Sequence, residues 1–328
     1  MGCKLVKLSY FKSLTENNYS IEELNELRNK MMEKNKNFYQ ELEMDSPFVD
    51  THRDICYSIE KIQLHSHPFY EILLCESGNL QYLIEDKRYR LQKGDIVLVP
   101  PGISHRPIFD EKLIEPYERI VLWISSELVH IFKQKCTDEI NSTNVLSIPS
   151  LLRTANHQND QLCEFIRRGC FERERCLPNW EAFLFGNTIA LLSLLVRGAV
   201  DCSYSLPSEH PEILDKIISY IEANYSSKIT LEKTAQEFHI SQSTLGKLFN
   251  QKLNISFYHF VTQIRLINAK RLIENGEILE SISLLVGFTD YSTFYRAFKH
   301  EYGISPRDYR KLINRTISVQ RLNAHNKT

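Results

Sequence analysis

Two histidines and a glutamate lie close together in the segment HSHPFYEILL, residues 65–74. One residue separates His65 from His67, and Glu71 follows His67 after three others. In an extended strand these odd-numbered residues point to the same face. Imidazole nitrogens and a carboxylate on one face suit zinc, manganese, iron or nickel. The segment therefore predicts either a divalent transition-metal site or a polar binding pocket.

A second segment supplies a further histidine behind a turn. Gly94 is followed by Pro100, Gly102 and His105 in the spacing G-(x)5-P-x-G-(x)2-H. The glycines and the proline shape turns and carry no information about a metal. His105 is therefore expected either as a fourth ligand or as another polar wall of the same pocket.

The region that must position these residues, about 51–125, has the pattern of short strands. The apolar runs EILLC, LQYLI, YRL and DIVLVP are separated by the turn signals ESGN, EDK and QKGD. Such spacing predicts a small barrel or sandwich, and a barrel of this size can hold one small ligand. Leu73 and Cys75 continue the face of Glu71, so that face is expected to line the lumen.

Helices are expected on both sides of the strands. Residues 1–50 are predicted to form an N-terminal helical extension. Residues 51–200 are predicted to form one domain for ligand binding and dimerisation, whose helices at about 160–200 include AFLFGNTIALLSLLV. That nearly all-apolar stretch must be buried in the core or between subunits. Residues 201–211, rich in Ser and Pro, are interpreted as a linker.

Two segments with the same pattern fill the C-terminal region, 212–315, ahead of a tail at 316–328. Thr230 is expected to cap a helix of the first segment, and Asp290 a helix of the second. Gly287 stands where the second segment needs a tight turn. A short helix, a tight turn and a second helix form a helix-turn-helix.

The joining sequence SFYHFVTQIRLINAKRLIEN predicts one long amphipathic helix between the two motifs. Two such motifs could place their second helices in successive major grooves on one face of DNA. In the second motif, Ile282, Leu285 and Val286 are expected to line the buried face of the first helix.

The sequences IRLINAKRLI and VGFTDYSTFYRAFKHEYGISPRDYRK resemble the AraC/XylS family of bacterial transcription regulators, over about residues 212–312. Asn254 replaces a usual Gly and Ser283 a usual Ala, and both residues fit, because Asn tolerates the left-handed conformation and Ser is small. The strand region resembles the cupin fold that this family commonly uses for sensing. The resemblance implies an α+β two-domain chain, with an N-terminal cupin-like β-barrel and a C-terminal all-α tandem helix-turn-helix domain.

The resemblance also assigns residues to DNA. The first recognition helix would present Ser243, Gly246 and Lys247, and the bare Gly246 favours phosphate and shape readout over base contacts. In the second, Arg296 suits bidentate guanine readout and Lys299 a phosphate. The full set expected on the second helix is Tyr291, Ser292, Tyr295, Arg296 and Lys299.

In this reading the barrel lumen is an effector pocket for a carbohydrate or related metabolite. Trp123 adds a possible stacking surface. The alternative occupant is a divalent transition metal on His65, His67, Glu71 and His105, and no other cofactor is expected. The expected pocket walls are His65, His67, Tyr70, Glu71, Tyr82 and His105.

A ligand-responsive transcription factor is the leading hypothesis, and an enzyme is not expected. It would bind double-stranded promoter DNA as a homodimer, with activation favoured over repression and RNA polymerase as the further partner of an activator. Two alternatives stay open, namely a metal-dependent cupin enzyme with a DNA-binding tail and a scaffold protein with degenerate DNA contacts.

Cysteine usage and apolar content bear on the compartment. None of the eight cysteines forms a CxxC pair, which argues against a thiol zinc site and fits a reducing cytoplasm. The N-terminus lacks the apolar run of a signal peptide, and no stretch approaches the ~20 apolar residues of a membrane helix. A cytoplasmic protein without a membrane partner is expected.

Overall fold

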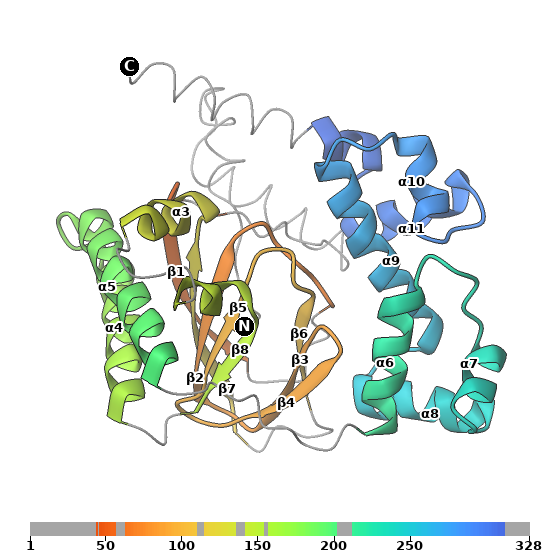
Figure 1. Cartoon of the computed structure of the whole chain (residues 1–328), viewed down its shortest axis with the longest axis horizontal. Helices are drawn as coiled ribbons and strands as arrows, with labels where there is room; N and C mark the ends of the chain where they lie inside the picture. Colours follow the sequence, from red (N-terminus) through yellow and green to blue (C-terminus); the bar gives the residue numbers. More distant parts are fainter. Residues whose placement is uncertain are drawn as a thin grey trace, which may run out of the picture. The chain divides into compact units, whose positions relative to one another are not determined.

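The computed structural model describes residue 44 and residues 46–56, 63–109, 115–135, 142–153, 157–201 and 212–311. Most of the predicted N-terminal extension, nearly all of the linker and the whole tail therefore lie outside the described residues. The chain divides into two compact units, one built mainly from residues 44–219 and the other mainly from residues 220–311 (Figure 1).

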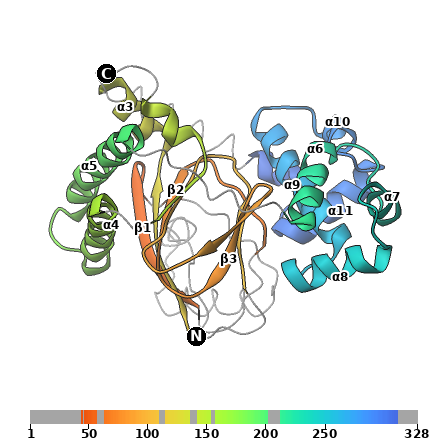
Figure 2. The same cartoon turned by 60° about the horizontal axis from the view of Figure 1, so that its bottom comes forward.

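Two antiparallel sheets form the first unit, which confirms the cupin-like prediction. The larger sheet has the strand order β1-β7-β2-β5-β8, and the smaller has the order β4-β3-β6. Figure 2 shows β1 and β2 opposite β3. The strands are β1 (Val49–Cys56), β2 (Tyr70–Ser77), β3 (Leu80–Ile84), β4 (Lys87–Leu91), β5 (Ile96–Val99), β6 (His105–Ile108), β7 (Tyr117–Ile124) and β8 (Ser150–Leu152).

Side chains along β2 alternate between two cores. Ile72 and Leu74 pack in a core that also contains residues of the flanking helices. Leu73 and Cys75 pack in a second core, between the two sheets. Because successive strand residues point to opposite faces, Glu71 lies on the interior face, as the sequence predicts.

Helices cover the outer face of the larger sheet, and α4 and α5 lie beside β1 (Figure 1). Contrary to the expectation from the sequence, the stretch Trp180–Arg197 within α5 is long and apolar enough to cross a membrane, and it is the one such segment in the described ranges. It contributes Leu184, Leu191 and Leu192 to the core shared with the sheet, although only 39% of it is buried. The flanking elements are α3 (Ser126–Lys135), η1 (Ser142–Ser147), α4 (His157–Arg175) and α5 (Trp180–Asp201).

The second unit is helical and contains both predicted helix-turn-helix motifs. The first motif is α7 and α8, the second is α10 and α11, and the long helix α9 joins them. The predicted caps are present, since Thr230 Oγ1 accepts from the backbone N–H of Lys233 and Asp290 Oδ1 from that of Thr293. Its helices are the C-terminal end of α6 (Ile213–Asn224), whose first residues belong to the first unit, and α7 (Leu231–Glu237), α8 (Gln242–Leu253), α9 (Phe257–Glu274), α10 (Leu279–Leu285) and α11 (Tyr291–Tyr302).

The turn of the second motif depends on Gly287. Its φ is +88°, and a Cβ at this position would lie 2.5 Å from the carbonyl oxygen of Tyr225. Asn254 adopts the left-handed conformation that was expected of it, with φ at 54°. The prediction for Leu285 is wrong, because its side chain is 51% exposed. The buried stripe of α10 runs instead through Ile282, Ser283 and the capping residue Val286.

Candidate functional site

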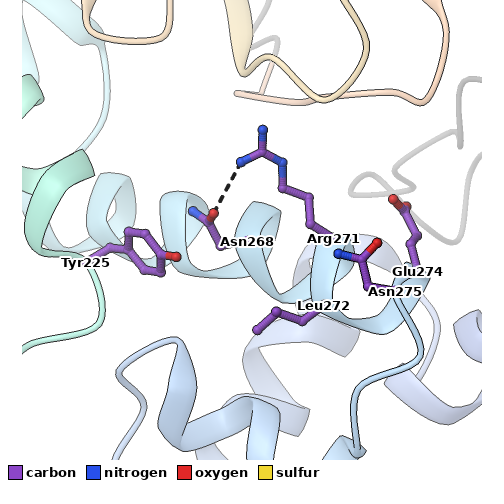
Figure 3. Close-up of a pocket in the computed structure, with 6 residues that line it drawn as sticks. All are labelled: Tyr225, Asn268, Arg271, Leu272, Glu274 and Asn275. Atoms are coloured by element: carbon purple, nitrogen blue, oxygen red, sulfur yellow. Dashed lines mark hydrogen bonds between the residues drawn. The ribbon is translucent and has the colours of Figure 1, made fainter.

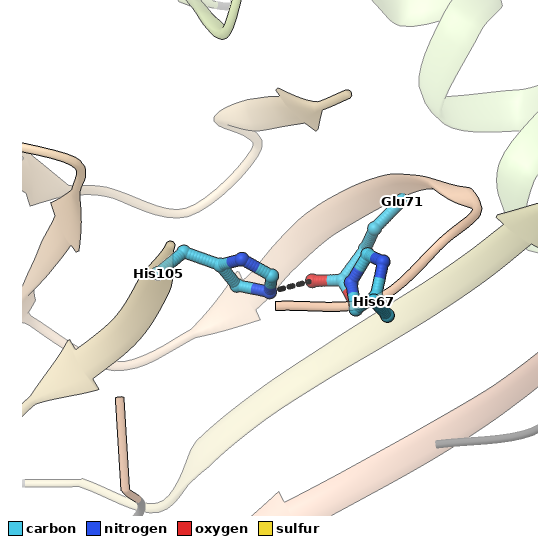
Figure 4. A group of neighbouring side chains, drawn as sticks. All are labelled: His67, Glu71 and His105. Atoms are coloured by element: carbon cyan, nitrogen blue, oxygen red, sulfur yellow. Dashed lines mark ion pairs between the residues drawn. The ribbon is translucent and has the colours of Figure 1, made fainter. Parts of the chain in front are cut away.

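Three of the four predicted ligand residues come together inside the first unit. His67, Glu71 and His105 are all buried, and one donor atom from each lies within 4.8 Å of the others (Figure 4). We call these three residues the lumen cluster. His65 lies beside the cluster, with its ring centroid 4.4 Å from that of His105, but it does not complete the group.

Backbone hydrogen bonds join the two sequence segments that supply the cluster. His65 and His105 form an isolated antiparallel bridge, with their N–H and C=O groups paired at 3.2 and 2.9 Å. The N–H of Gly102 donates to the carbonyl of His67 at 2.8 Å. The turn around Gly102 therefore holds His67 near the start of β6, while β2 supplies Glu71.

Each imidazole is fixed by a hydrogen bond from Nδ1 to a backbone carbonyl two residues away. Because a carbonyl only accepts, each neutral ring carries its proton on Nδ1 and a lone pair on Nε2. The carbonyl partners of His65, His67 and His105 are Gln63, Phe69 and Ile103, at 2.9, 2.8 and 2.9 Å respectively.

The Nε2 atoms of His67 and His105 are buried and have no hydrogen-bond partner among the described residues. They lie 3.3 and 3.7 Å from the two carboxylate oxygens of Glu71. Lone pairs that face a carboxylate repel it unless a proton, a cation or a hydrogen-bond donor lies between them. The cluster can therefore bind a proton or a cation, or accept hydrogen bonds from a ligand.

Two further side chains fix the Glu71 carboxylate. The indole N–H of Trp123 donates to Oε2 at 2.9 Å, and the hydroxyl of Tyr82 lies 3.5 Å from Oε1. Burial alone would raise the pKa of Glu71, but the positive charge that His67 and His105 carry when protonated holds it well below its usual value. Burial lowers the pKa of His105 to about 4, so its ring is neutral at pH 7. The cluster therefore combines a charged carboxylate with at least one neutral imidazole.

The prediction that Tyr70 lines this pocket is wrong. Tyr70 is half-buried and packs against the helix-facing core, on the opposite face of β2 from Glu71. Its even position in the strand explains the error, because only odd-numbered residues of β2 face the interior.

Sequence reasoning missed three polar residues on the interior face. His52 packs edge-on against Trp123, with ring centroids 4.7 Å apart. Arg119 donates to the carboxylate of Asp54 from two nitrogens, at 3.0 and 3.2 Å. The signal for His52 and Asp54 was the polar run THRDIC within a strand, since such side chains at alternate positions of a covered strand must find partners.

The residues predicted to read DNA lie on the outer surface of the two motifs. On α8, Ser243 and Lys247 are exposed, and a Cβ added to Gly246 would meet nothing within 4 Å. On α11, Arg296 and Lys299 are exposed. Ser292 is also exposed, whereas Tyr291 and Tyr295 are half-buried, with ring centroids 6.3 Å apart.

A surface cavity of about 390 Å³ lies along α9 and includes none of the predicted site residues (Figure 3). Arg271 Nη1 donates to Asn268 Oδ1 at 3.5 Å on its rim. Glu274, also in the lining, accepts from the hydroxyl of Tyr309 at 2.6 Å. The lining consists of Tyr225, Asn268, Arg271, Leu272, Glu274 and Asn275.

Family models match both units. The AraC-like ligand binding domain matches residues 52–130, and a helix-turn-helix domain matches residues 234–312. An AraC-like ligand binding domain followed by a helix-turn-helix domain confirms the predicted resemblance to the AraC/XylS regulators. The chain is a DNA-binding transcription regulator with an N-terminal ligand-binding domain, as the sequence predicts.

Curated relatives of this regulator include the HTH-type transcriptional activator RhaR. The protein of that name from Shigella dysenteriae serotype 1 is 23% identical over 267 residues, which cover 78% of this chain and 90% of the relative. RhaR from Escherichia coli O139:H28 is 23% identical over 258 residues, which cover 76% and 86%.

Similar solved structures include apo ToxT from Vibrio cholerae, which is 15% identical with a TM-score of 0.37 and covers 83% of this chain and 100% of ToxT. The C-terminal domain of AraT, a response regulator from Geobacillus stearothermophilus, is 32% identical with a TM-score of 0.31. It covers 32% of this chain and 88% of that domain.

Proposed function

We propose that this regulator is an activator switched by a small, neutral, hydroxyl-rich effector that binds at the lumen cluster. The observation that carries the proposal is the unmatched lone pairs of His67 and His105 beside the charged Glu71. The nearby donors, Trp123 and Tyr82, already face Glu71, so the hydrogen-bonding capacity left at the cluster is that of acceptors. Such a site favours hydroxyl donors over an anion, which fits a carbohydrate or related metabolite.

Effector-dependent operator binding tests this proposal. An operator is first recovered by in vitro selection with the full chain, and its affinity is then measured with neutral sugars and with the matching sugar acids. We expect a neutral sugar, and no sugar acid, to change operator affinity. Glu71→Gln should abolish that response, whereas Glu127→Gln, at an exposed position on α3, should keep it. A response to sugar acids alone would contradict the proposal.

A second candidate for the cluster is a divalent transition metal. Ligands about 2.0–2.2 Å from a tetrahedral ion lie about 3.3–3.6 Å apart. The Nε2 atoms of His67 and His105 lie 3.3 and 3.7 Å from different oxygens of Glu71, and one donor atom from each side chain lies within 4.8 Å of the others. The Nδ1–carbonyl hydrogen bonds of His67 and His105 are also the outer-shell contacts that orient metal-binding imidazoles. His67, Glu71 and His105 would hold the ion, with His65 beside them, and the ion would supply positive charge.

Elemental analysis of protein purified without a nickel column separates the two candidates. One equivalent of a transition metal, lost in His105→Gln and retained in a His130→Gln control on α3, would favour the metal. A metal-free preparation that still responds to the effector would rule out the metal as the occupant of the cluster.

Dimerisation through α5 is part of the proposed mechanism. Only 39% of the apolar stretch Trp180–Arg197 is buried, and a Cβ on the exposed Gly186 would meet nothing within 4 Å. Gly186→Arg should therefore leave the fold intact and shift the protein from dimer to monomer in sedimentation velocity. An unchanged dimer would rule out this face.

The remaining partners follow from the proposed mechanism. An activator works through RNA polymerase on promoter DNA, in the cytoplasm and without a membrane partner. The relatives named above are transcriptional activators, which supports a regulator rather than an enzyme.

A further inference from the structure

A buried polar pair joins α9 to α11 within the second unit. Nε2 of Gln263 donates to Oε1 of Glu301 at 2.9 Å, and the two residues are only 1% and 3% exposed. The amide oxygen of Gln263 is also buried, and it has no hydrogen-bond partner among the described residues. Burying such groups costs free energy, which a single hydrogen bond offsets only in part. A contribution to stability therefore does not account for the pair.

The pair lies where the pattern of both helices favours apolar residues. On α9, Leu266 lies three residues after Gln263, and on α11, Glu301 lies three residues after Phe298. Leu266 and Phe298 belong to the same core. Because residues three apart share one face of a helix, apolar side chains at 263 and 301 would extend that core.

The position of the pair along α9 is between the packing regions of the two helix-turn-helix motifs. Phe260, about one turn before Gln263, packs edge-on against Phe249 of α8, with ring centroids 5.4 Å apart. Leu266, about one turn after Gln263, packs in the core of the second motif. The hydrogen bond to Glu301 therefore ties α11 to α9 next to the contact between α9 and α8.

We propose that Gln263 and Glu301 are positioning residues that fix α11 relative to α8, and thereby the spacing of the operator elements that the regulator accepts. Apolar packing tolerates small shifts of one helix on another, whereas a hydrogen bond requires a particular geometry. Helices that enter successive major grooves require DNA elements a fixed distance apart. Both residues are buried, so they act through α11 and not by touching DNA.

Affinity for operators of altered spacing tests the proposal. An operator is recovered by in vitro selection and footprinted with the full chain, which locates the protected grooves. One base pair is inserted or deleted between neighbouring protected grooves, and the affinity for the original operator is divided by that for the altered one. The test variant combines Gln263→Met with Glu301→Met, because methionine is unbranched, has a similar length and is only a weak hydrogen-bond acceptor.

We expect wild type to lose affinity about tenfold on either change of spacing, and the double variant to lose about threefold or less. The urea midpoint of the double variant should equal or exceed that of wild type, because apolar groups of similar shape replace both members of the pair. Equal affinity ratios in the two proteins would overturn the proposal, as would a wild type that shows no spacing preference.

Glu301→Gln is the conservative variant. It keeps the oxygen that accepts from Gln263 and adds a donor for the unmatched amide oxygen, so it should retain the affinity ratio of wild type. A ratio as low as that of the methionine variant would contradict the proposal, because the hydrogen bond would then not be what fixes the spacing.

Phe298→Leu distinguishes positioning from a general weakening of the same core. It leaves both polar residues in place, so it should lower the urea midpoint and keep the affinity ratio of wild type. A reduced ratio in this variant would show that any loosening of the core relaxes the spacing, and the proposal would fail.

The exchanged pair, Gln263→Glu with Glu301→Gln, decides the matter if the methionine variant does not fold. It places the donor on α11 and the acceptor on α9, and it should keep the affinity ratio of wild type, whereas a reduced ratio overturns the proposal. A selection that returns no operator overturns it as well. No effector is present in these measurements, so the failure of the effector proposal would leave their outcomes unchanged.

Discussion

The lumen cluster and the two helices predicted to read DNA, α8 and α11, place their polar groups in opposite surroundings. His67, Glu71 and His105 are buried, come from two separate segments of the chain and leave acceptors unmatched. On the reading helices, Arg296 and Lys299 are exposed and lie on a single helix. The cluster is thus coupled to the stability of its unit, whereas exposed side chains on a helix can change without disturbing the fold.

The largest predicted effect on stability is at Gly287, which lies in the DNA-binding unit but at a position where substitution disturbs the fold. Gly287→Ala should destabilise the second unit by about 3 kcal/mol, because the positive φ and the 2.5 Å approach to the Tyr225 carbonyl both become strained. Urea denaturation and operator affinity measure the effect. Gly246→Ala, at an open helical position, should change stability by about 1 kcal/mol at most, in the stabilising direction. Equal losses of stability in the two variants would show that the turn at Gly287 is no more sensitive to substitution than the exposed surface of α8.

Acid should destabilise the first unit through the lumen cluster. The folded-state pKa of His105 is about 4, against about 6.5 in the unfolded chain. Between these values only the unfolded chain binds the proton, so stability falls as pH drops from about 6.5 to about 4. The loss for this residue is on the order of 3 kcal/mol.

The urea midpoint of the first unit, measured at pH 7 and pH 5 with a chelator present, tests this expectation. His105→Gln should lower the midpoint less on acidification than wild type does. The exposed His130→Gln variant should follow wild type. An identical pH response in all three proteins would show that the buried imidazole does not couple protonation to stability.

On the reading helices, substitutions should change DNA affinity and leave stability alone. Arg296→Ala should cost about 1–3 kcal/mol of binding at one base position and relax the preference there. Lys299→Ala should weaken binding to all sequences and reduce the salt slope by about 1. Affinities for single-base operator variants at several salt concentrations distinguish the two. A uniform loss in Arg296→Ala would move that residue from base readout to phosphate contact.

The smallest effect is expected at a helix end. Thr230→Ala removes the side-chain acceptor for the backbone N–H of Lys233 and should cost about 1 kcal/mol of stability in the second unit. Thr230→Ser should restore most of it, because serine offers the same acceptor. Thermal unfolding of the two variants provides the measurement, and an equal loss in both would assign the effect to the lost methyl group.

The sequence predicted both domains and most of the lumen cluster, because these depend on spacing. Strand alternation placed Glu71 on the interior face, and cap and turn residues such as Thr230 and Gly287 located the helix-turn-helix motifs. The same alternation excludes Tyr70 from the pocket, and only the chemistry of its side chain favours a place there. Leu285 was misplaced because a seven-residue helix gives too short a periodic pattern to fix its buried face.

Other features depend on contacts between distant residues, which spacing does not encode. The Nδ1 hydrogen bonds that fix the imidazole tautomers require particular loop carbonyls at His67 and His105. The pairing of Arg119 with Asp54 depends on the register of β1 and β7. β8 was not predicted, because three residues are too few for a visible strand pattern.

The intrinsic fluorescence of Trp123 can report on what binds at the lumen cluster. Its N–H is bonded to the carboxylate that any occupant of the cluster must approach. The chain has only one other tryptophan, Trp180, at the start of α5. In a Trp180→Phe variant all tryptophan emission therefore comes from beside Glu71. Effectors and metals can then be screened by fluorescence titration, without knowledge of the operator.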